Sequence, residues 1–179
     1  MDVFEAIQNR RSVRSYMPDP VPKSKLKRIL DAARLSPSAM NMQPWHFIVV
    51  SSPQKRNMLT EGRFAKFLAE APLVIVGCGN KSRSPKWYVV DTAIAMQSMV
   101  LTATGEGLGT CWIGSFNEAH VKSLLNIPGN YGVIALLTLG YPREKSSISQ
   151  RIISLASKTK KVEEIASMEE YSIAYIDPQ

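Results

Sequence analysis

Apolar residues recur at intervals of three and four in five segments of the chain, the spacing that gathers side chains on one face of an α-helix. The helices predicted from this spacing cover residues 2–9, 23–34, 53–71, 88–106 and 117–125. Four short apolar runs are instead typical of buried strands. The predicted strands cover residues 47–51, 73–77, 110–113 and 133–139. This alternation predicts an α/β or α+β sheet with long helices against it.

The predicted helix over residues 88–106 is apolar on nearly all of its faces. At helical spacing Val89, Ile94 and Met99 lie on three different sides. A helix that is apolar all round is buried on every side, and a chain of this size offers little cover for it. We therefore expect a homodimer whose interface contains this helix, and a monomeric mass at micromolar concentration would contradict that expectation.

Composition sets the frame for this pattern. The chain has 179 residues, of which 45% are hydrophobic, enough for a packed core. It contains no internal repeat and no linker rich in glycine and serine at which it could be divided. We therefore predict one domain over residues 1–179.

Several classes of protein are disfavoured. No apolar run approaches the roughly 18 residues of a membrane-spanning helix, and the N-terminal residues lack the pattern of a secretory signal. We therefore expect a cytoplasmic protein. The two cysteines, Cys78 and Cys111, stand in no CxxC or Cys/His pair, so we predict buried core thiols and no metal site.

Positive charge is concentrated at the end of the first predicted helix. The net charge of +7 indicates affinity for anions, without separating nucleic acid from a phosphorylated small molecule. Three guanidinium groups and a hydroxyl within five residues can bind an oxyanion through several donors. These residues are Arg10, Arg11, Ser12 and Arg14. The alternative is a solvated helix end, where cations are stabilising without any ligand.

Two further segments combine polar or small residues in an unusual way. Residues 37–45 place serine and amide side chains between two prolines, directly before a strand, although a plain loop also uses such residues. Residues 105–115 carry glycines at the end of a helix and of a strand, where a flat ligand could approach the backbone. A helix cap explains Gly107 and Gly109, but explains Gly114 less well.

The familiar nucleotide-binding and hydrolase motifs are missing. The Gly77-Cys78-Gly79 stretch follows a strand but lacks the third glycine and the helix of a Rossmann fingerprint. The sequence also contains no Walker, HExxH or GxSxG pattern. Phosphoryl transfer, zinc proteolysis and serine hydrolysis therefore lack their usual support.

The three segments, in this order, resemble the nitroreductase family of flavin oxidoreductases. Its members share an RRSxR-like motif, here residues 10–14, and a PSxxNxQPW motif, here residues 37–45. The likeness extends through residues 107–114 to Leu139-Gly140-Tyr141-Pro142 and covers about the first 145 residues. It implies an α+β fold of three-layer α/β/α type, with a small mixed, mostly antiparallel sheet. It also implies a homodimer with FMN at the subunit interface and a tail, from about residue 143, extended over the partner subunit.

The resemblance assigns roles to individual residues. At the phosphate and ribityl chain of FMN it places Arg10, Arg11 and Ser12, and near the pyrimidine edge Arg14. The loop expected to reach the FMN of the partner subunit contains Pro37, Ser38, Ala39, Asn41 and Gln43. Along the flavin it places Trp112, Ile113 and Gly114, with the Gly114 N–H near flavin N5. A basic residue after the last strand also holds the phosphate in the family. Arg143, Lys145 and Arg151 are available here, and we assign this role to Arg151.

The implied activity is that of an FMN-dependent NAD(P)H oxidoreductase. NADH or NADPH would reduce the flavin, and a nitroaromatic, a quinone or a similar small electron acceptor would then reoxidise it in a ping-pong sequence. No catalytic side chain is expected, because the cofactor carries the hydride. One alternative keeps the fold but dehalogenates, fragments flavin or oxidises azolines. A non-catalytic, basic nucleic-acid-binding protein is less well supported, because no RNP, KH or helix-turn-helix signature is present.

Overall fold

The structure, a computed structural model, describes residues 1–59, 66–143, 159–171, 173 and 175. Its contacts divide the chain into two units, Met1–Arg143 and Glu144–Gln179. The described part of the second unit contains a short 3-10 helix, η2 (Val162–Glu164). The single domain over residues 1–179 and the tail extended over a partner stay predictions.

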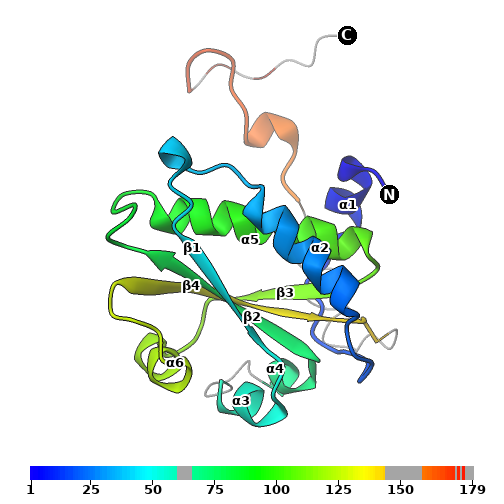
Figure 1. Cartoon of the computed structure of the whole chain (residues 1–179). Helices are drawn as coiled ribbons and strands as arrows, with labels where there is room; N and C mark the ends of the chain where they lie inside the picture. Colours follow the sequence, from blue (N-terminus) through cyan, green and yellow to red (C-terminus); the bar gives the residue numbers. More distant parts are fainter. Residues whose placement is uncertain (60–65, 144–158, 172, 174, 176–179) are drawn as a thin grey trace. The chain divides into compact units, whose positions relative to one another are not determined.

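The first unit is built on a four-stranded sheet with the order β1-β2-β4-β3 (Figure 1). Its strands are β1 (Trp45–Val50), β2 (Leu73–Asn80), β3 (Gly109–Ile113) and β4 (Tyr131–Gly140). Neighbouring strands are antiparallel throughout. The parallel component expected of a mixed sheet is therefore limited, in the described residues, to one isolated bridge between Ser12 and Thr110.

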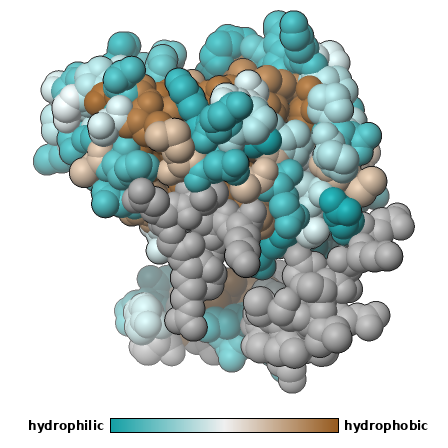
Figure 2. Space-filling model, turned by 90° about the horizontal axis from the view of Figure 1, so that it is seen from below, coloured by the Kyte–Doolittle hydropathy of each residue, from teal (hydrophilic) through white to brown (hydrophobic). Residues whose placement is uncertain are grey.

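Helices cover both faces of this sheet, as predicted for a three-layer α+β fold (Figure 1). On one face lie α2 (Lys23–Arg34) and α5 (Tyr88–Gly105), with α1 (Val3–Asn9) contacting α5. The opposite face carries α3 (Pro53–Met58), α4 (Lys66–Glu70) and α6 (Glu118–Leu125). Figure 2 views the molecule from this second side, where apolar side chains form patches between hydrophilic ones.

The alternation of side chains along the strands divides the core into two clusters. Ile75 of β2 packs with Met96 and Met99 of α5. Its neighbours Val74 and Val76 point to the other face and belong to the cluster beneath α3, α4 and α6. Both faces of the central strand are therefore buried, which explains its nearly continuous apolar sequence.

Two glycines of β2 let α5 lie directly on the sheet. A Cβ atom built on Gly77 would stand 2.2 Å from the Met96 Sδ, and one on Gly79 would stand 2.9 Å from the Thr92 Oγ1. Both distances are too short for real contacts. These glycines, whose spacing does not fit a Rossmann fingerprint, thus serve the packing of a helix on a strand.

The helix α5 is not buried on every side within one chain. Its inner face is fully covered, whereas Val89, Val90 and Ile94 are 44%, 46% and 40% exposed. One chain therefore leaves part of this apolar helix uncovered, as the sequence pattern predicts, and burial of that part in a homodimer stays a prediction. The helix α1 also exposes apolar side chains. Phe4 is 65% exposed, and Ala6 is the one buried residue of this helix.

The predicted helix over residues 53–71 is interrupted. The first part, α3, ends at Met58, and α4 begins at Lys66. The Met58 carbonyl accepts a hydrogen bond of 2.9 Å from the ring of His120, and Leu59 turns into the core with 4% exposure. The Met58 carbonyl, at the end of α3, thus has a long-range partner that local spacing cannot predict.

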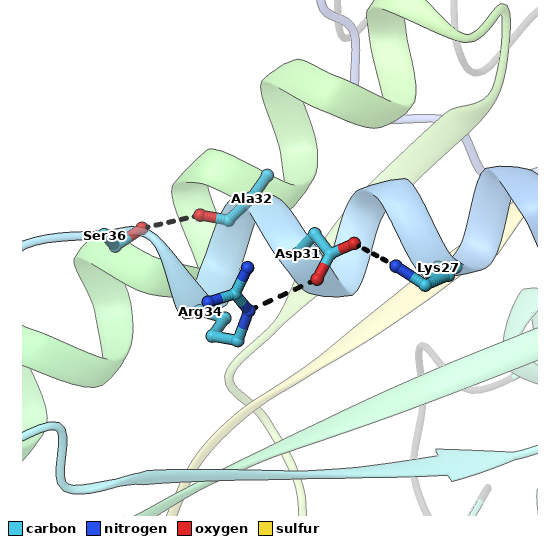
Figure 3. A network of polar contacts seen from close by, with 5 residues as sticks. All are labelled: Lys27, Asp31, Ala32, Arg34 and Ser36. Atoms are coloured by element: carbon cyan, nitrogen blue, oxygen red, sulfur yellow. Dashed lines mark hydrogen bonds and ion pairs between the residues drawn. The ribbon is translucent and has the colours of Figure 1, made fainter.

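The exposed side of α2 is polar (Figure 3). Asp31 accepts hydrogen bonds from Lys27 at 2.6 Å and from Arg34 at 3.2 Å, and these bonds lower the pKa of its carboxyl group. Just beyond the helix, the Ser36 hydroxyl donates to the Ala32 carbonyl at 3.1 Å. The solvated face confirms the amphipathic pattern from which this helix was predicted.

Candidate functional site

The arginine-rich segment, residues 10–14, leaves α1 and runs along the edge of β3. Arg10 ends the helix in an extended conformation. Ser12 then forms the parallel bridge to Thr110, and the Val13 N–H donates to the Thr110 carbonyl at 2.9 Å. The segment is therefore fixed to the sheet by its own backbone.

Close packing at a glycine reinforces this attachment. A Cβ atom on Gly109 would lie 2.6 Å from the Val13 Cγ2, so the segment occupies the space that a side chain would fill. Gly109 is explained by this approach of the Val13 side chain, rather than by the helix cap that its sequence position suggests. Gly107, two residues earlier, does have the positive φ of a helix cap, at 74°.

Three side chains of the segment lie near enough to the Cys111 thiol to influence it. Burial raises the pKa of this thiol, while Arg14, Ser12 and Arg10 act in the opposite direction and lower it. Within the described residues neither Arg10 nor Arg14 forms an ion pair. Two guanidinium groups and a hydroxyl thus lie near Cys111 of β3, and the two cations remain able to bind an anion.

Arg11 has a different role in the structure. Its Nη1 donates to the carbonyls of Gln8 at 2.5 Å and Arg10 at 2.9 Å, at the end of α1. These are carbonyls that a helix end leaves without intrahelical partners. The helix-end explanation therefore holds for this one arginine, whose remaining guanidinium donors stay available.

The strand β3 carries the other predicted residues of this region. Trp112 is half-buried and packs against the cluster beneath α5, and Ile113 is buried on the other face. Gly114 follows the strand and is exposed, and a Cβ atom built on it would meet nothing within 4 Å. The backbone of Gly114 is therefore open to a flat ligand.

The second predicted segment, residues 37–43, is a loop with unusual backbone conformations. Met40, Asn41 and Gln43 have positive φ angles of 51°, 54° and 46°. The Ser38 hydroxyl accepts the Gln43 N–H at 2.9 Å, and the Gln43 Nε2 donates to the Asn41 Oδ1 at 2.8 Å. The polar residues thus hold the loop in shape and leave it half-buried to exposed.

One buried acid fastens this loop to α5. The Asp91 carboxylate, 3% exposed, accepts the Ala39 N–H at 3.1 Å and contacts the Ser84 hydroxyl at 3.5 Å. Asp91 lies in the first turn of α5, where a negative charge is favoured. Pro37, at the start of the loop, is exposed.

A single chain does not bring the two segments together. The loop leads into β1 and the arginine-rich segment borders β3, which are the two edge strands of the sheet (Figure 1). They also lie toward opposite ends of it, because Trp45 is level with Gly132, whereas Gly109 pairs with Gly140. Arg151 lies outside the described residues.

Three residues with a part in this geometry are missing from the sequence predictions. Asp91 could have been noticed as the lone charge in an apolar helix. Tyr16 and Thr138, buried and hydrogen-bonded to each other at 2.6 Å, have no comparable signal, because their pairing joins positions 122 residues apart. Cys78 and Cys111 are buried thiols, as predicted.

Two other site types are not found in the described part of the chain. It contains no group of three or more histidine, cysteine or acidic residues that could hold a metal ion. None of its helices is both long and apolar enough to cross a membrane.

Comparison with known proteins identifies the family. Residues 7–72 and 59–141 match the sequence model of the nitroreductase family. A protein of Methanothermobacter thermautotrophicus, named as a candidate NADH dehydrogenase/NAD(P)H nitroreductase, is 36% identical over 151 residues, covering 80% of this chain and 79% of that protein.

Solved structures agree with this match. A candidate NADH dehydrogenase/NAD(P)H nitroreductase from Parabacteroides distasonis has a TM-score of 0.83 and 28% identity, covering 94% of this chain and 98% of that one. An FMN-dependent nitroreductase from Clostridium difficile has a TM-score of 0.74 and 29% identity, covering 88% and 99%. From its sequence and its fold, this chain belongs to the nitroreductase family.

Proposed function

We propose that the protein is an FMN-dependent NAD(P)H oxidoreductase that reduces small electron-poor acceptors such as nitroaromatics and quinones. Membership of the nitroreductase family makes it an NAD(P)H-dependent flavin oxidoreductase. The FMN dependence named for the Clostridium difficile structure supports the choice of cofactor. The acceptor class and the order of the steps are part of the proposal.

The residues beside β3 suit FMN chemically. Arg10, Arg14 and Ser12 offer cationic and hydroxyl donors that would hold the phosphate and the polar edge of the flavin. Gly114 offers an open backbone next to them, where an isoalloxazine ring would meet no side chain. The chain thus offers donors for the phosphate group of FMN, open space for its flat ring and a backbone N–H beside that ring.

The observation that carries the proposal is the separation of the two segments. One chain holds its arginine-rich segment and its 37–43 loop at opposite edges of one sheet. A second copy related by a twofold axis would bring the loop of one chain to the arginine-rich segment of the other. Apolar side chains exposed on α1 and α5, including Phe4, Val90 and Ile94, give such a homodimer a surface to bury.

The chain's own residues would bind the cofactor and influence its chemistry. Bound FMN supplies the group that accepts hydride from NAD(P)H and passes it on. The Arg14 guanidinium would stabilise negative charge on the pyrimidine edge, and the Gly114 N–H would donate to N5. Acid–base catalysis by a side chain is not required, which agrees with a site built from arginines, small residues and backbone donors.

A hollow beside the 37–43 loop has an apolar lining that suits an aromatic acceptor. It has a volume of about 330 Å³ and includes Met40, Met42, Pro85 and Trp87 among its lining residues. Thioether and aromatic groups bind flat apolar rings. If the loop meets the FMN of the second copy, this hollow borders the flavin face on which an acceptor would stack.

An absorption spectrum tests the cofactor and the reductant together. The purified protein should show the visible flavin bands, should release FMN on denaturation, and should lose those bands when NADH or NADPH is added without oxygen. A protein that binds no FMN, even when FMN is supplied in excess, would contradict the proposal. Intersecting rather than parallel initial-rate lines would contradict the ping-pong order alone.

A further inference from the structure

A buried chain of hydroxyl groups connects the arginine-rich segment to the centre of the sheet. The Tyr16 hydroxyl lies 2.7 Å from the Val13 carbonyl and 2.6 Å from the Thr138 Oγ1. Tyr16 is 1% exposed, and Thr138 of β4 is fully buried. The Thr138 hydroxyl also lies 3.4 Å from the carbonyl of Cys111.

The direction of this chain follows from the number of protons available. A carbonyl can only accept, so the single proton of the Tyr16 hydroxyl goes to Val13. The short contact to Thr138 must then use the single threonine proton, which makes Tyr16 the acceptor there and leaves none for the Cys111 carbonyl, 3.4 Å away. The order is Thr138 to Tyr16 to Val13. Burial raises the pKa of the Tyr16 phenol, so it keeps its proton across the physiological range.

These contacts fix the residue at the centre of the segment on three sides. The Val13 N–H is held by Thr110, its carbonyl by Tyr16, and its side chain lies against Gly109. In an extended segment successive side chains alternate in direction. With Val13 turned toward Gly109, the neighbouring Ser12 and Arg14 are directed together to the other side.

We propose that Tyr16, backed by Thr138, is a positioning residue that holds Ser12 in place for the phosphate of FMN, although Tyr16 does not touch the cofactor itself. The inference rests on the proposed function, since it concerns how that cofactor is bound. Tyr16 would act through the Val13 carbonyl, and Thr138 through the orientation of the Tyr16 hydroxyl. A purely structural tyrosine would affect folding alone.

The test compares two ligands that differ only in the phosphate group, with dissociation constants of FMN and riboflavin measured by flavin fluorescence. Tyr16→Phe should weaken FMN binding about tenfold and riboflavin binding by less than about threefold, as expected when one hydrogen bond that orders phosphate ligands is lost. Thr138→Val should act in the same direction but less strongly. Tyr131→Phe, which removes a hydroxyl at the other end of β4, is the matched control and should change neither constant.

A second comparison separates positioning from a general loss of stability. Ser12→Ala should weaken FMN binding by itself. In the double variant Ser12→Ala/Tyr16→Phe the two effects should be less than additive, because the hydroxyl that Tyr16 positions is then absent.

The outcomes of these titrations differ clearly. Equal weakening for FMN and riboflavin, or strict additivity, would overturn the positioning role while leaving FMN binding intact. A wild-type protein that binds no FMN would instead overturn the proposed function, and this inference with it.

Discussion

The two segments expected to meet FMN are held in place in different ways. The arginine-rich segment lies along β3 and is fixed by its backbone, by Gly109 and by the Tyr16 hydroxyl. The 37–43 loop pairs with no strand, takes three left-handed conformations and is fastened to the scaffold by Asp91. The first is an extension of the sheet, and the second is a shaped loop with a side-chain anchor.

This difference bears on how each segment fails. Several independent contacts hold the arginine-rich segment, so losing one should loosen it by degrees. The loop depends on two side-chain anchors, Asp91 and Arg83, whose Nε donates to the Met42 carbonyl, and on residues that tolerate positive φ. Its shape should therefore be lost more abruptly. Substitutions matched between the two regions can test this contrast, and they also test whether the segments serve one site.

The largest expected effect is loss and recovery of FMN binding on mixing two variants. Arg10→Gln/Arg14→Gln removes the cations, and Asn41→Gly/Gln43→Gly removes the loop amides while glycine keeps the positive φ. Each variant alone should lose FMN on gel filtration. If a site combines segments from two chains, half of randomly mixed dimers carry one intact site of two, so about a quarter of wild-type FMN binding should return.

The control for this experiment is a mixture of each variant with itself, treated identically. Flavin retained by the co-purified, re-equilibrated mixture is the quantity to measure. No recovery, in variants that still form dimers, would mean that each chain builds its site alone and that the separation of the two segments has another explanation.

A smaller effect is expected at the close contact that seats the arginine-rich segment. Gly109→Ala places a methyl group against Val13, and such overpacking costs about 2–3 kcal/mol of unfolding free energy. Gly105→Ala is the matched control, because a Cβ there meets nothing within 4 Å and α5 should gain about 0.5–1 kcal/mol. Urea denaturation measures both, and equal changes would show that the contact with Val13 is unimportant.

Removing the Asp91 anchor of the loop should lower the free energy of unfolding somewhat less than Gly109→Ala does. Asp91→Ala leaves the half-buried Ala39 N–H without its acceptor, which should cost about 1–2 kcal/mol of unfolding free energy, because removing a buried charge offsets part of the loss. Asp31→Ala, on the solvated face of α2, should leave unfolding nearly unchanged. FMN binding should fall with Asp91→Ala alone. If both variants bind FMN like the wild type, Asp91 does not shape the loop.

The smallest effect distinguishes the two regions through the chain's own thiols. Burial raises the pKa of Cys111, which lies beneath the arginine-rich segment, and raises that of Cys78, in the other core cluster, to about 11. Both should therefore react slowly with a disulfide reagent at neutral pH. Gly109→Ala should speed the labelling of Cys111 only, and Asp91→Ala should change neither rate. Mass spectrometry of the labelled peptides assigns each thiol.

The raised pKa values also predict how stability depends on pH. A thiol that stays protonated in the folded state, but ionises in the unfolded chain, favours unfolding as pH rises from the ordinary thiol pKa toward 11. Replacing Cys78 with alanine should flatten this part of the stability curve. An unchanged slope between neutral and strongly basic pH would contradict the assignment.

Local patterns were sufficient for most of the fold. The Asp2 and Asn117 caps, the amphipathic α2 and the four strands all follow from spacing and from side chains near in sequence, although the edge strand β1 is half-buried rather than buried. Pairing shifted the boundaries. For example, β2 and β4 extend beyond their apolar runs because Asn80 and Tyr131 pair with each other. Where a contact spans much of the chain, as between His120 and Met58, the sequence pattern misled.

The residue clusters of the candidate site are visible in the sequence, but their arrangement in space is not. The clusters at residues 10–14 and 37–43 stand out by residue type alone, whereas their separation depends on the strand order, which periodicity does not contain. Asp91 and Tyr16 act through buried hydrogen bonds to distant backbone groups. A single polar residue among apolar ones carries too little information to reveal its partner.

The bare stretch of β2 has a consequence beyond the core. Because Gly77 and Gly79 leave no side chain under α5, the height of that helix above the sheet is set by backbone and by Met96. A larger residue at Gly79 would meet the Tyr88 carbonyl of α5 itself and would have to displace that end of the helix, and Val90 and Ile94 with it. The shape of the outer apolar surface thus depends on the absence of side chains at two buried positions of β2.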